Sequence, residues 1–392
     1  MLSRNEMQHV ERSLANSAQD TRDEIGFLLI HQGFADRFFP GTSVLHTRIR
    51  YALFVPWIYQ RAANYKKGSD VATAIRRLLV ELAIRLKQLG GEPYDVIGGD
   101  KLGELTSQPP DVSYWTALRT WGIVLPTVAS RSDAVRRLAL GSKTTALDDD
   151  GGALEERATE VFAGLPRWPE RWDDSHSPLK FMLQPEESDF LRDRLSVLNR
   201  PGEDKHSLLA RLVMAREYYP GNTRELPRQL DARADAADRI ALRVARDAAA
   251  LAAIGRAVYG AILEQLIVKD GGVDEPTFRN QLFTHFTQYG EATVNCDLNV
   301  AEELFPTLPS YLIEVLRETQ AYVRRGNPDD FMDLRSVYQT AEVRRKSSRR
   351  ARLVDTDRAA ARRAEWNKGR HNTTPLHYRW GIVRDMLRDL NA

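Results

Sequence analysis

Apolar residues recur every three or four positions along much of the chain, which is the spacing of an amphipathic α-helix. Residues 231–268 form the longest such segment, rich in alanine and without proline. One apolar stripe runs along it, formed by Ile240, Val244, Ala248, Leu251, Ile254, Val258, Ile262 and Leu266. Segments with strand character are few, and the best are 122–125 and 179–183. The pattern predicts a mainly α, multi-helical protein.

Loop-forming residues suggest where the helical segments separate. Residues 144–152 contain three aspartates and two glycines and are predicted to form an exposed linker. Gly271-Gly272 closes the long helix. We therefore expect an N-terminal helical domain over 1–145, a middle helical domain over 153–270 and a C-terminal helical section over 271–392.

The composition is that of an ordinary soluble protein, with 42% hydrophobic and 28% charged residues. The single cysteine, Cys296, excludes an intramolecular disulfide and a cysteine-rich zinc site, and suits a reducing compartment. The start of the chain lacks the apolar region of a signal peptide. No stretch approaches the length of a membrane span, and the best, 51–59, is too short. A cytoplasmic protein without membrane contact is expected.

Residues 99–121 have the spacing of a helix-turn-helix motif. A short helix is predicted over 99–106 and a second over 112–121, where Tyr114 and Leu118 share one face. Small hydroxyls and an arginine on an exposed helix are what a recognition helix presents to the major groove. The candidate nucleic-acid-binding residues are Ser113, Thr116, Arg119 and Thr120. A small winged-helix element near 95–145 is one interpretation, and an amphipathic helix pinned by Trp115 and Trp121 is the other.

Charge is concentrated near the C-terminus, although the whole chain carries only +2. Residues 341–370 contain eleven Lys and Arg against four acids, so this segment is strongly basic and the rest of the chain is slightly acidic. On a helix, Arg345, Arg349 and Arg352 would form a basic stripe flanked by Lys346 and Arg350. Such a stripe can follow a phosphate backbone without reading sequence. The alternatives are a solvated face or a surface that meets the acidic remainder of the chain or a partner.

The block from Phe34 to Tyr51 contains a Pro-Gly break followed by Thr42 and Ser43, which are good helix caps. A helix beginning there would point free amides at a bound anion, with Arg48 and Arg50 one to two turns further on. The alternative is a structural block that locks two helices together. Pro56 is expected to kink or end the second helix.

No complete enzyme motif is present. Residues 141–145 resemble the end of a phosphate-binding loop but lack its first glycine and the preceding strand. The eight histidines show no metal-ligand spacing, and no G-x-S-x-G element occurs. We therefore expect no catalytic residue, no metal and no cofactor.

Four ordered blocks resemble an uncharacterised bacterial family of unknown function. They are Phe34-Ala-Asp-Arg-Phe-Phe-Pro-Gly-Thr-Ser43 with Thr47-Arg-Ile-Arg-Tyr51, Ser113-x-Tyr-Trp-x-x-Leu-x-x-Trp-Gly-Ile123, Phe181 to Ala210, and Arg350-Ala-Arg-Leu353 with Leu376-His-Tyr-Arg-Trp380. The resemblance implies no established catalytic residues. It implies a gene neighbourhood of bacterial phage defence, beside helicase-like and phospholipase-D-like nuclease genes.

These features favour a non-catalytic, DNA-contacting subunit of an antiphage defence complex. One alternative is a scaffold that bridges helicase and nuclease partners without touching nucleic acid, which would bury its basic residues against acidic ones and expose a broad apolar patch. The other is a divergent nuclease, which would need at least three carboxylates converging in one pocket.

Overall fold

A computed structural model of the chain describes residues 23–64, 70–88, 95–141, 160–221 and 223–392, and it confirms a mainly α fold. No β-strand occurs among these residues. Two isolated β-bridges are present, Val124 with Phe162 and Asn199 with His206. The two predicted strands, 122–125 and 179–183, are therefore wrong. Residues 122–125 form a single bridge with 161–163, through two backbone hydrogen bonds of 2.9 Å, and 179–183 form no bridge, so neither segment builds a ladder.

The contacts divide the chain into two compact units that are each discontinuous in sequence. Unit 1 combines the described residues up to Phe34 with Glu225–Tyr378, and unit 2 combines Ala35–Arg224 with Arg379–Ala392. The predicted linker at 144–152 lies outside the described residues. The predicted division into 1–145, 153–270 and 271–392 is not tested by these contacts and stays a prediction.

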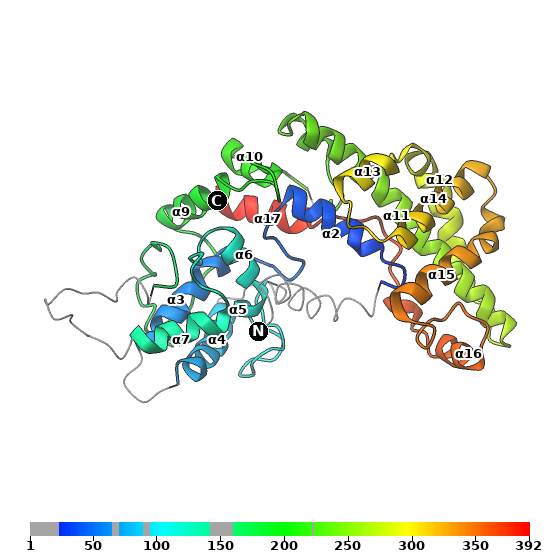
Figure 1. Cartoon of the computed structure of the whole chain (residues 1–392). Helices are drawn as coiled ribbons and strands as arrows, with labels where there is room; N and C mark the ends of the chain where they lie inside the picture. Colours follow the sequence, from blue (N-terminus) through cyan, green and yellow to red (C-terminus); the bar gives the residue numbers. More distant parts are fainter. Residues whose placement is uncertain (1–22, 65–69, 89–94, 142–159, 222) are drawn as a thin grey trace, which may run out of the picture. The chain divides into compact units, whose positions relative to one another are not determined.

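Unit 1 is a set of helices around one long central helix (Figure 1). Its elements are most of α2 (Phe27–Phe38), η1 (Arg228–Ala232), α11 (Ala236–Lys269), α12 (Thr277–Asn295), α13 (Leu298–Leu304), α14 (Ser310–Arg325), η2 (Pro328–Leu334), α15 (Arg335–Lys346), α16 (Asp357–Ala364) and η3 (Lys368–Arg370).

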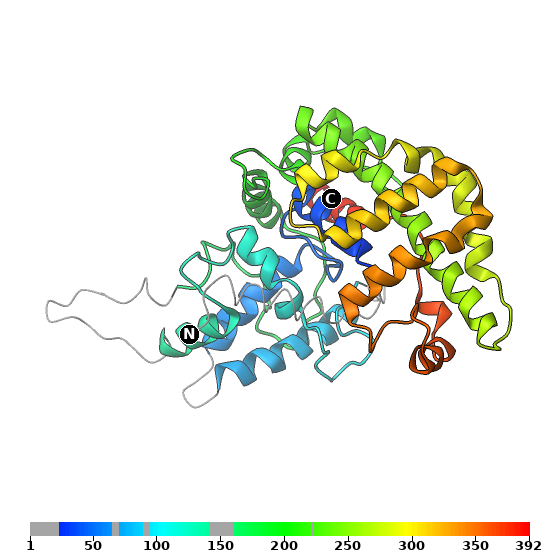
Figure 2. The same ribbon diagram turned by 45° about the vertical axis from the view of Figure 1, so that its right-hand side comes forward.

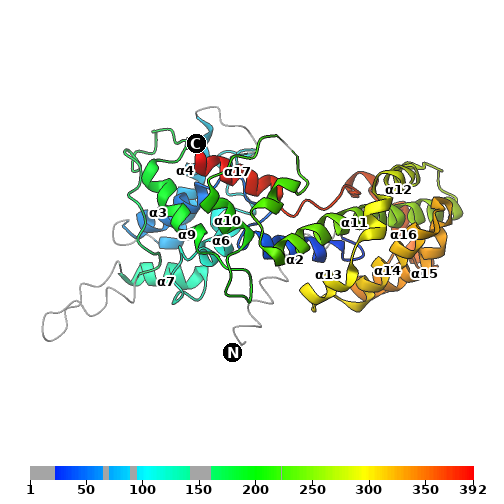
Figure 3. The same ribbon diagram turned by 90° about the horizontal axis from the view of Figure 1, so that it is seen from above.

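The central helix is α11, which the apolar stripe in the sequence predicted. Asp235 caps its start by accepting from the backbone N–H of Asp238 at 2.8 Å. The stripe is buried from Val244 onward, whereas Ile240 is 45% exposed. Beyond the last turn, Gly271 adopts φ +87°, the left-handed conformation that ends many helices. Helix α12 packs along α11, and α14 contacts both of these helices, as Figures 1 and 3 show.

Helix α11 is long and apolar enough, by length and composition alone, to cross a membrane. The expectation that no segment reaches this length was therefore wrong. Within unit 1, 78% of the most apolar window of this helix is buried inside the protein. That burial is the pattern of a core helix, so the composition is weak evidence for a membrane span.

The contact between α11 and α12 depends on Gly260. A Cβ atom added at this position would lie 2.5 Å from Phe278 Cγ and 2.8 Å from its Cβ, and the Cβ can move only with the backbone. We expect Gly260→Ala to lower the free energy of unfolding by about 1–3 kcal/mol through overpacking. Urea denaturation followed by circular dichroism measures this change.

Gly290 of α12 provides the matched control. A Cβ there would meet only Val323 Cγ1, at an ordinary 3.6 Å. Gly290→Ala should be neutral or stabilise by up to about 1 kcal/mol, because alanine favours helix. Equal stabilisation by both substitutions would contradict a tight helix contact at Gly260.

Unit 2 is built from shorter helices, of which α3, α4 and α7 pack together (Figure 2). Its elements, besides the last residues of α2, are α3 (Tyr51–Ala63), α4 (Val71–Lys87), α5 (Pro110–Ser113), α6 (Trp115–Thr120), α7 (Arg131–Gly141), α9 (Pro185–Ser196), α10 (Leu208–Ala215) and α17 (Trp380–Asn391). Helix α3 continues through Pro56, contrary to the expected kink or end. Every residue from Tyr51 to Tyr59 is buried, and this packing holds both halves in one helix.

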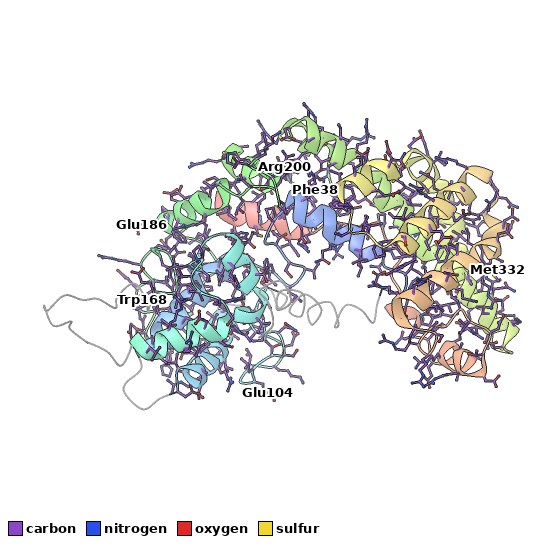
Figure 4. All side chains as sticks on the ribbon, viewed as in Figure 1. Phe38, Glu104, Trp168, Glu186, Arg200 and Met332 are labelled. Carbon is purple, nitrogen blue, oxygen red and sulfur yellow. The ribbon has the colours of Figure 1, made fainter. Side chains whose placement is uncertain are left out.

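Buried arginines fix the irregular segments of unit 2. Arg85 of α4 donates to the backbone carbonyls of Ser177 (2.7 Å), Trp172 (2.8 Å) and Arg171 (3.1 Å), so it holds the loop-rich stretch against α4. Arg200, labelled in Figure 4, has a fully buried side chain and pairs with Glu203 at 3.2 Å. The hydrogen bonds of Arg85 satisfy loop carbonyls that no helix or sheet would otherwise pair.

Candidate nucleic-acid interface

The predicted recognition helix is short and partly buried. Helix α6 has six residues and spans about 9 Å, and the predicted first helix, 99–106, is a series of turns. Ser113 is buried and its hydroxyl donates to carbonyls of the preceding turn, so its predicted exposure is wrong. The structure does not confirm a winged-helix element.

Three predicted contact residues remain at the surface of α6. Thr116 and Thr120 are exposed, and Arg119 is half-buried, with Nη1 donating to the carbonyl of Ala129 at 2.8 Å. Trp115 and Trp121 are both buried, and Trp121 Nε1 donates to the carbonyl of Pro40. The two tryptophans therefore anchor this segment, and a DNA contact by Thr116, Arg119 and Thr120 stays a prediction.

The anion site predicted around Thr42 is replaced by a tight turn. No helix begins at Thr42 or Ser43, because α3 starts only at Tyr51. The buried Thr42 hydroxyl donates to the carbonyl of Phe39 at 2.7 Å, and the backbone N–H of Ser43 donates to His46 Nδ1 at 3.3 Å. No array of free helix amides is therefore available here.

Arg48 and Arg50 are engaged in ion pairs within unit 2. Arg48 binds both carboxylate oxygens of Asp389 in α17, with its closest contact at 2.7 Å, and also Asp95 at 3.0 Å. Arg50 pairs with Glu187 of α9 at 2.6 Å, and both side chains are almost fully buried. The geometry assigns both arginines to the framework, where they join segments far apart in sequence.

The predicted basic stripe does not lie on one helix. Helix α15 ends at Lys346, and Ser347 follows with φ +71° and ψ +154°. This backbone conformation is unfavourable for a residue with a side chain, so the surrounding contacts must hold it. Arg345 lies before this break, and Arg349 and Arg352 lie after it. The prediction of a single stripe failed because it required the helix to continue past Ser347.

Three of the six basic residues in 343–354 are paired inside unit 1. Arg345 Nε donates to the carbonyl of Asp23 at 2.8 Å, and Arg352 pairs with Glu24 at 2.7 Å. Lys346 contacts Glu24 and lies 3.7 Å from the buried Glu342. Glu342 also accepts from the backbone N–H groups of Arg352 and Leu353, each at 2.9 Å. These bonds clamp the segment that follows α15 onto unit 1.

The electrostatics of this network agree with crowded positive charge. Burial, together with the nearby charges of Arg352, Arg350 and Arg362, lowers the pKa of Lys346 to about 7. Burial raises the pKa of Glu342, against hydrogen bonds that favour its charged form. For Lys346, burial is the larger cause and the neighbouring arginines add to it, so the charged form of this side chain is disfavoured relative to an exposed lysine.

The exposed basic residues of 343–354 are three arginines that we call the basic turn: Arg344, Arg349 and Arg350. Residues 343–354 contain six Lys and Arg and no acid. Among the described residues, no carboxylate lies within ion-pair distance of the basic turn. Arg350 Nε donates to the carbonyl of Lys346 at 3.0 Å, which orients its side chain. The sequence prediction had included Arg349 and Arg350 but not Arg344, which lies in the last turn of α15.

Carboxylates and histidines do not converge elsewhere. In the described ranges, no group of three or more His, Cys, Asp or Glu side chains is placed to hold a metal ion. Cys296 is buried, and burial raises the pKa of its thiol to about 12, so it stays protonated and unreactive at neutral pH. Neither a metal cluster nor Cys296 therefore offers a candidate site among the described residues, whereas the basic turn offers a candidate phosphate contact.

Comparison with known proteins gives one match. No curated protein and no solved structure is similar enough to be matched to the chain. The model of a family of unknown function, DUF6361, matches residues 12–269. That range spans about two thirds of the chain and ends at the last residue of α11, so the basic turn lies beyond it. The chain belongs to this family of unknown function, DUF6361.

Proposed function

We propose that the protein is a non-catalytic, DNA-contacting subunit of a bacterial antiphage defence complex, and that the basic turn contacts the phosphate backbone. The observation that carries the proposal is three exposed arginines, without a carboxylate partner among the described residues, in a segment of twelve residues that contains no acid. Arginine suits this contact because its planar guanidinium pairs with two phosphate oxygens at once.

The anchoring of the basic turn supports this role. Arg345, Lys346 and Arg352 hold the backbone on both sides of Arg349 and Arg350 through Asp23, Glu24 and Glu342. A turn that is already fixed loses less conformational entropy when it binds. Contacts of this kind attract any duplex, and they carry no sequence information.

The place of the protein in a complex rests on resemblance. The resemblance of the four sequence blocks described above implies a gene neighbourhood with helicase-like and phospholipase-D-like nuclease genes of phage defence. We propose these two kinds of protein as partners. The DNA-contacting subunit would then hold the duplex while the partners supply the chemistry.

The salt dependence of duplex binding tests the phosphate contact. We expect Arg344→Gln, Arg349→Gln and Arg350→Gln together to weaken binding to two unrelated duplexes alike. The slope of log affinity against log salt should become shallower by about 2–3 units, since each neutralised phosphate contributes about 0.9. Fluorescence anisotropy with labelled duplexes at several salt concentrations measures both quantities.

A second triple variant controls for the loss of charge. Arg228, Arg239 and Arg243 are exposed arginines of the same unit, and their replacement by Gln removes the same charge elsewhere. This control should keep the wild-type slope. The proposed phosphate contact is wrong if the two triple variants bind DNA equally. It is also wrong if the variant of Arg344, Arg349 and Arg350 keeps the wild-type slope of log affinity against log salt.

A scaffold without nucleic-acid contact is the second candidate. This candidate is favoured by the pairing of Arg345, Lys346 and Arg352 with acids of the same unit. Three of the six basic residues in 343–354 are therefore not available to DNA. For a scaffold, the basic-turn variant would bind DNA as the wild type does and would lose its protein partner in a pull-down with nuclease treatment.

A further inference from the structure

An open groove lies at the start of α14 in unit 1, away from the residues of the basic turn. Its volume is about 640 Å³, within the range of sites that hold a ligand or a few side chains. Phe305, Leu308 and Ile313 supply its apolar surface, and Glu302, Glu314 and Glu318 supply its acids. We call it the acidic groove.

The floor of the acidic groove is held in place by packing. The ring of Phe305 meets the ring of Phe34 edge to face, with centroids 4.7 Å apart. Gly33 allows this approach, because a Cβ there would lie 3.0 Å from the Phe305 ring. The turn that follows contains Pro306 and is closed by a 3.0 Å hydrogen bond from the N–H of Leu308 to the carbonyl of Phe305. The floor is therefore preorganised.

The charge of the acidic groove is unbalanced. Arg317 pairs with Glu302 and also donates to Asn299 Oδ1 at 3.3 Å. Glu314 and Glu318 are both exposed, and within the described part of the chain neither has an ion-pair partner. They stand four residues apart on α14, so their charges repel each other. A cation between them would relieve this repulsion.

The chemistry selects the occupant. Negative charge disfavours DNA, and the carboxylates are not placed to share one metal ion. A long cationic side chain reaches two separated carboxylates while its neighbour fills the apolar floor. We propose that the acidic groove binds a segment of a partner protein in which a Lys or Arg stands beside an aliphatic or aromatic residue. This inference concerns protein recognition and is independent of the proposed DNA contact.

Selection of a displayed random octapeptide library on the immobilised full chain tests the proposal. We expect the enriched peptides to contain a Lys or Arg next to a large apolar residue. Glu314→Lys with Glu318→Lys, which reverses the charge, should abolish their enrichment. An enriched set without this pairing, or one that also binds the charge-reversed variant, would overturn the proposal.

A labelled peptide made from the most enriched sequence then gives magnitudes. We expect Glu314→Gln with Glu318→Gln to weaken its binding about three- to tenfold, as two exposed ion pairs allow. Glu291→Gln with Glu365→Gln removes two other exposed acids of unit 1 and should leave affinity unchanged. Duplex DNA binding should be unaffected by the groove variants, so the two proposals fail separately.

Two further outcomes would show a different occupant. If replacing the apolar residues of the peptide by Ser leaves its affinity unchanged and spermidine displaces it, the groove binds small polyamines and the peptide proposal is wrong. If the wild type self-associates in sedimentation and the charge-reversed variant does not, the occupant is a second copy of this chain.

Discussion

Replacement of Arg50 by Met should lower the free energy of unfolding of unit 2 by about 3–5 kcal/mol. The reason is the charge that would remain. Glu187 has a side chain that is 2% exposed, and Arg50 Nη2 lies 2.6 Å from its Oε1. Without the guanidinium, the carboxylate would be buried without a compensating charge. Arg50 also donates to the carbonyl of Lys180 at 2.6 Å, and that acceptor would lose its partner.

A double-mutant cycle separates the ion pair from the packing of the arginine. Glu187→Gln removes the negative charge and still accepts from the backbone N–H of Gln184, a bond of 3.1 Å that caps α9. Combined with Arg50→Met, it should recover about 1–3 kcal/mol of the loss. Additive single effects would mean that the pair contributes no coupling and that Arg50 acts through its packing and its hydrogen bond to Lys180.

Tryptophan fluorescence is a suitable probe for these measurements. Six of the seven tryptophans lie in unit 2, and the remaining one, Trp366, lies in unit 1. Urea denaturation followed by fluorescence therefore reports mainly on the unit that contains Arg50 and Glu187. A circular dichroism transition of the same samples, dominated by the long helices, reports on the chain as a whole.

Acidification from pH 7.5 to pH 5 should destabilise unit 2 by about 2 kcal/mol through His46 alone. The ring is buried and stacks on Tyr114, with centroids 4.1 Å apart. Its Nε2 lies 3.1 Å from the carbonyl of Ser113, so it carries the hydrogen, and its Nδ1 accepts from the N–H of Ser43. A second proton would face that N–H. Burial lowers the pKa of His46 to about 3.

The sign follows from the two protonation states. An unfolded histidine has a pKa near 6.5, so below that pH the unfolded chain takes up a proton that the folded chain refuses. Stability from this group is complete above pH 6.5 and falls as the pH decreases toward 3. In unit 1, burial lowers the pKa of His371 to about 4, which adds a change of the same sign.

A non-titrating variant isolates the contribution of His46. The stability advantage of the wild type over His46→Gln should shrink by about 2 kcal/mol between pH 7.5 and pH 5. His206→Gln, which replaces an exposed histidine of the same unit, serves as the control for the assay. An advantage that stays constant over this pH range would show that His46 takes up a proton in the folded protein as readily as in the unfolded chain.

Local sequence patterns were sufficient to predict helices whose start, apolar face and end are each marked by nearby residues. Asp235, the apolar stripe from Val244 onward and Gly271 define α11, because capping, periodicity and helix ending each act within a few residues. The apolar residues between Val71 and Leu86 recur at the same helical spacing and form the buried face of α4. The mainly α class followed from these elements.

The sequence by itself thus determined the helical class, the long central helix and the location of the concentrated positive charge. Only the tertiary structure decided which charges are free. Arg48 and Arg50 meet Asp389 and Glu187, acids more than a hundred residues away, and Arg345 meets Asp23. An ion pair depends on distance in space, which spacing along the chain does not encode, so the same arginine pattern gave a buried framework in one block and an exposed basic turn in another.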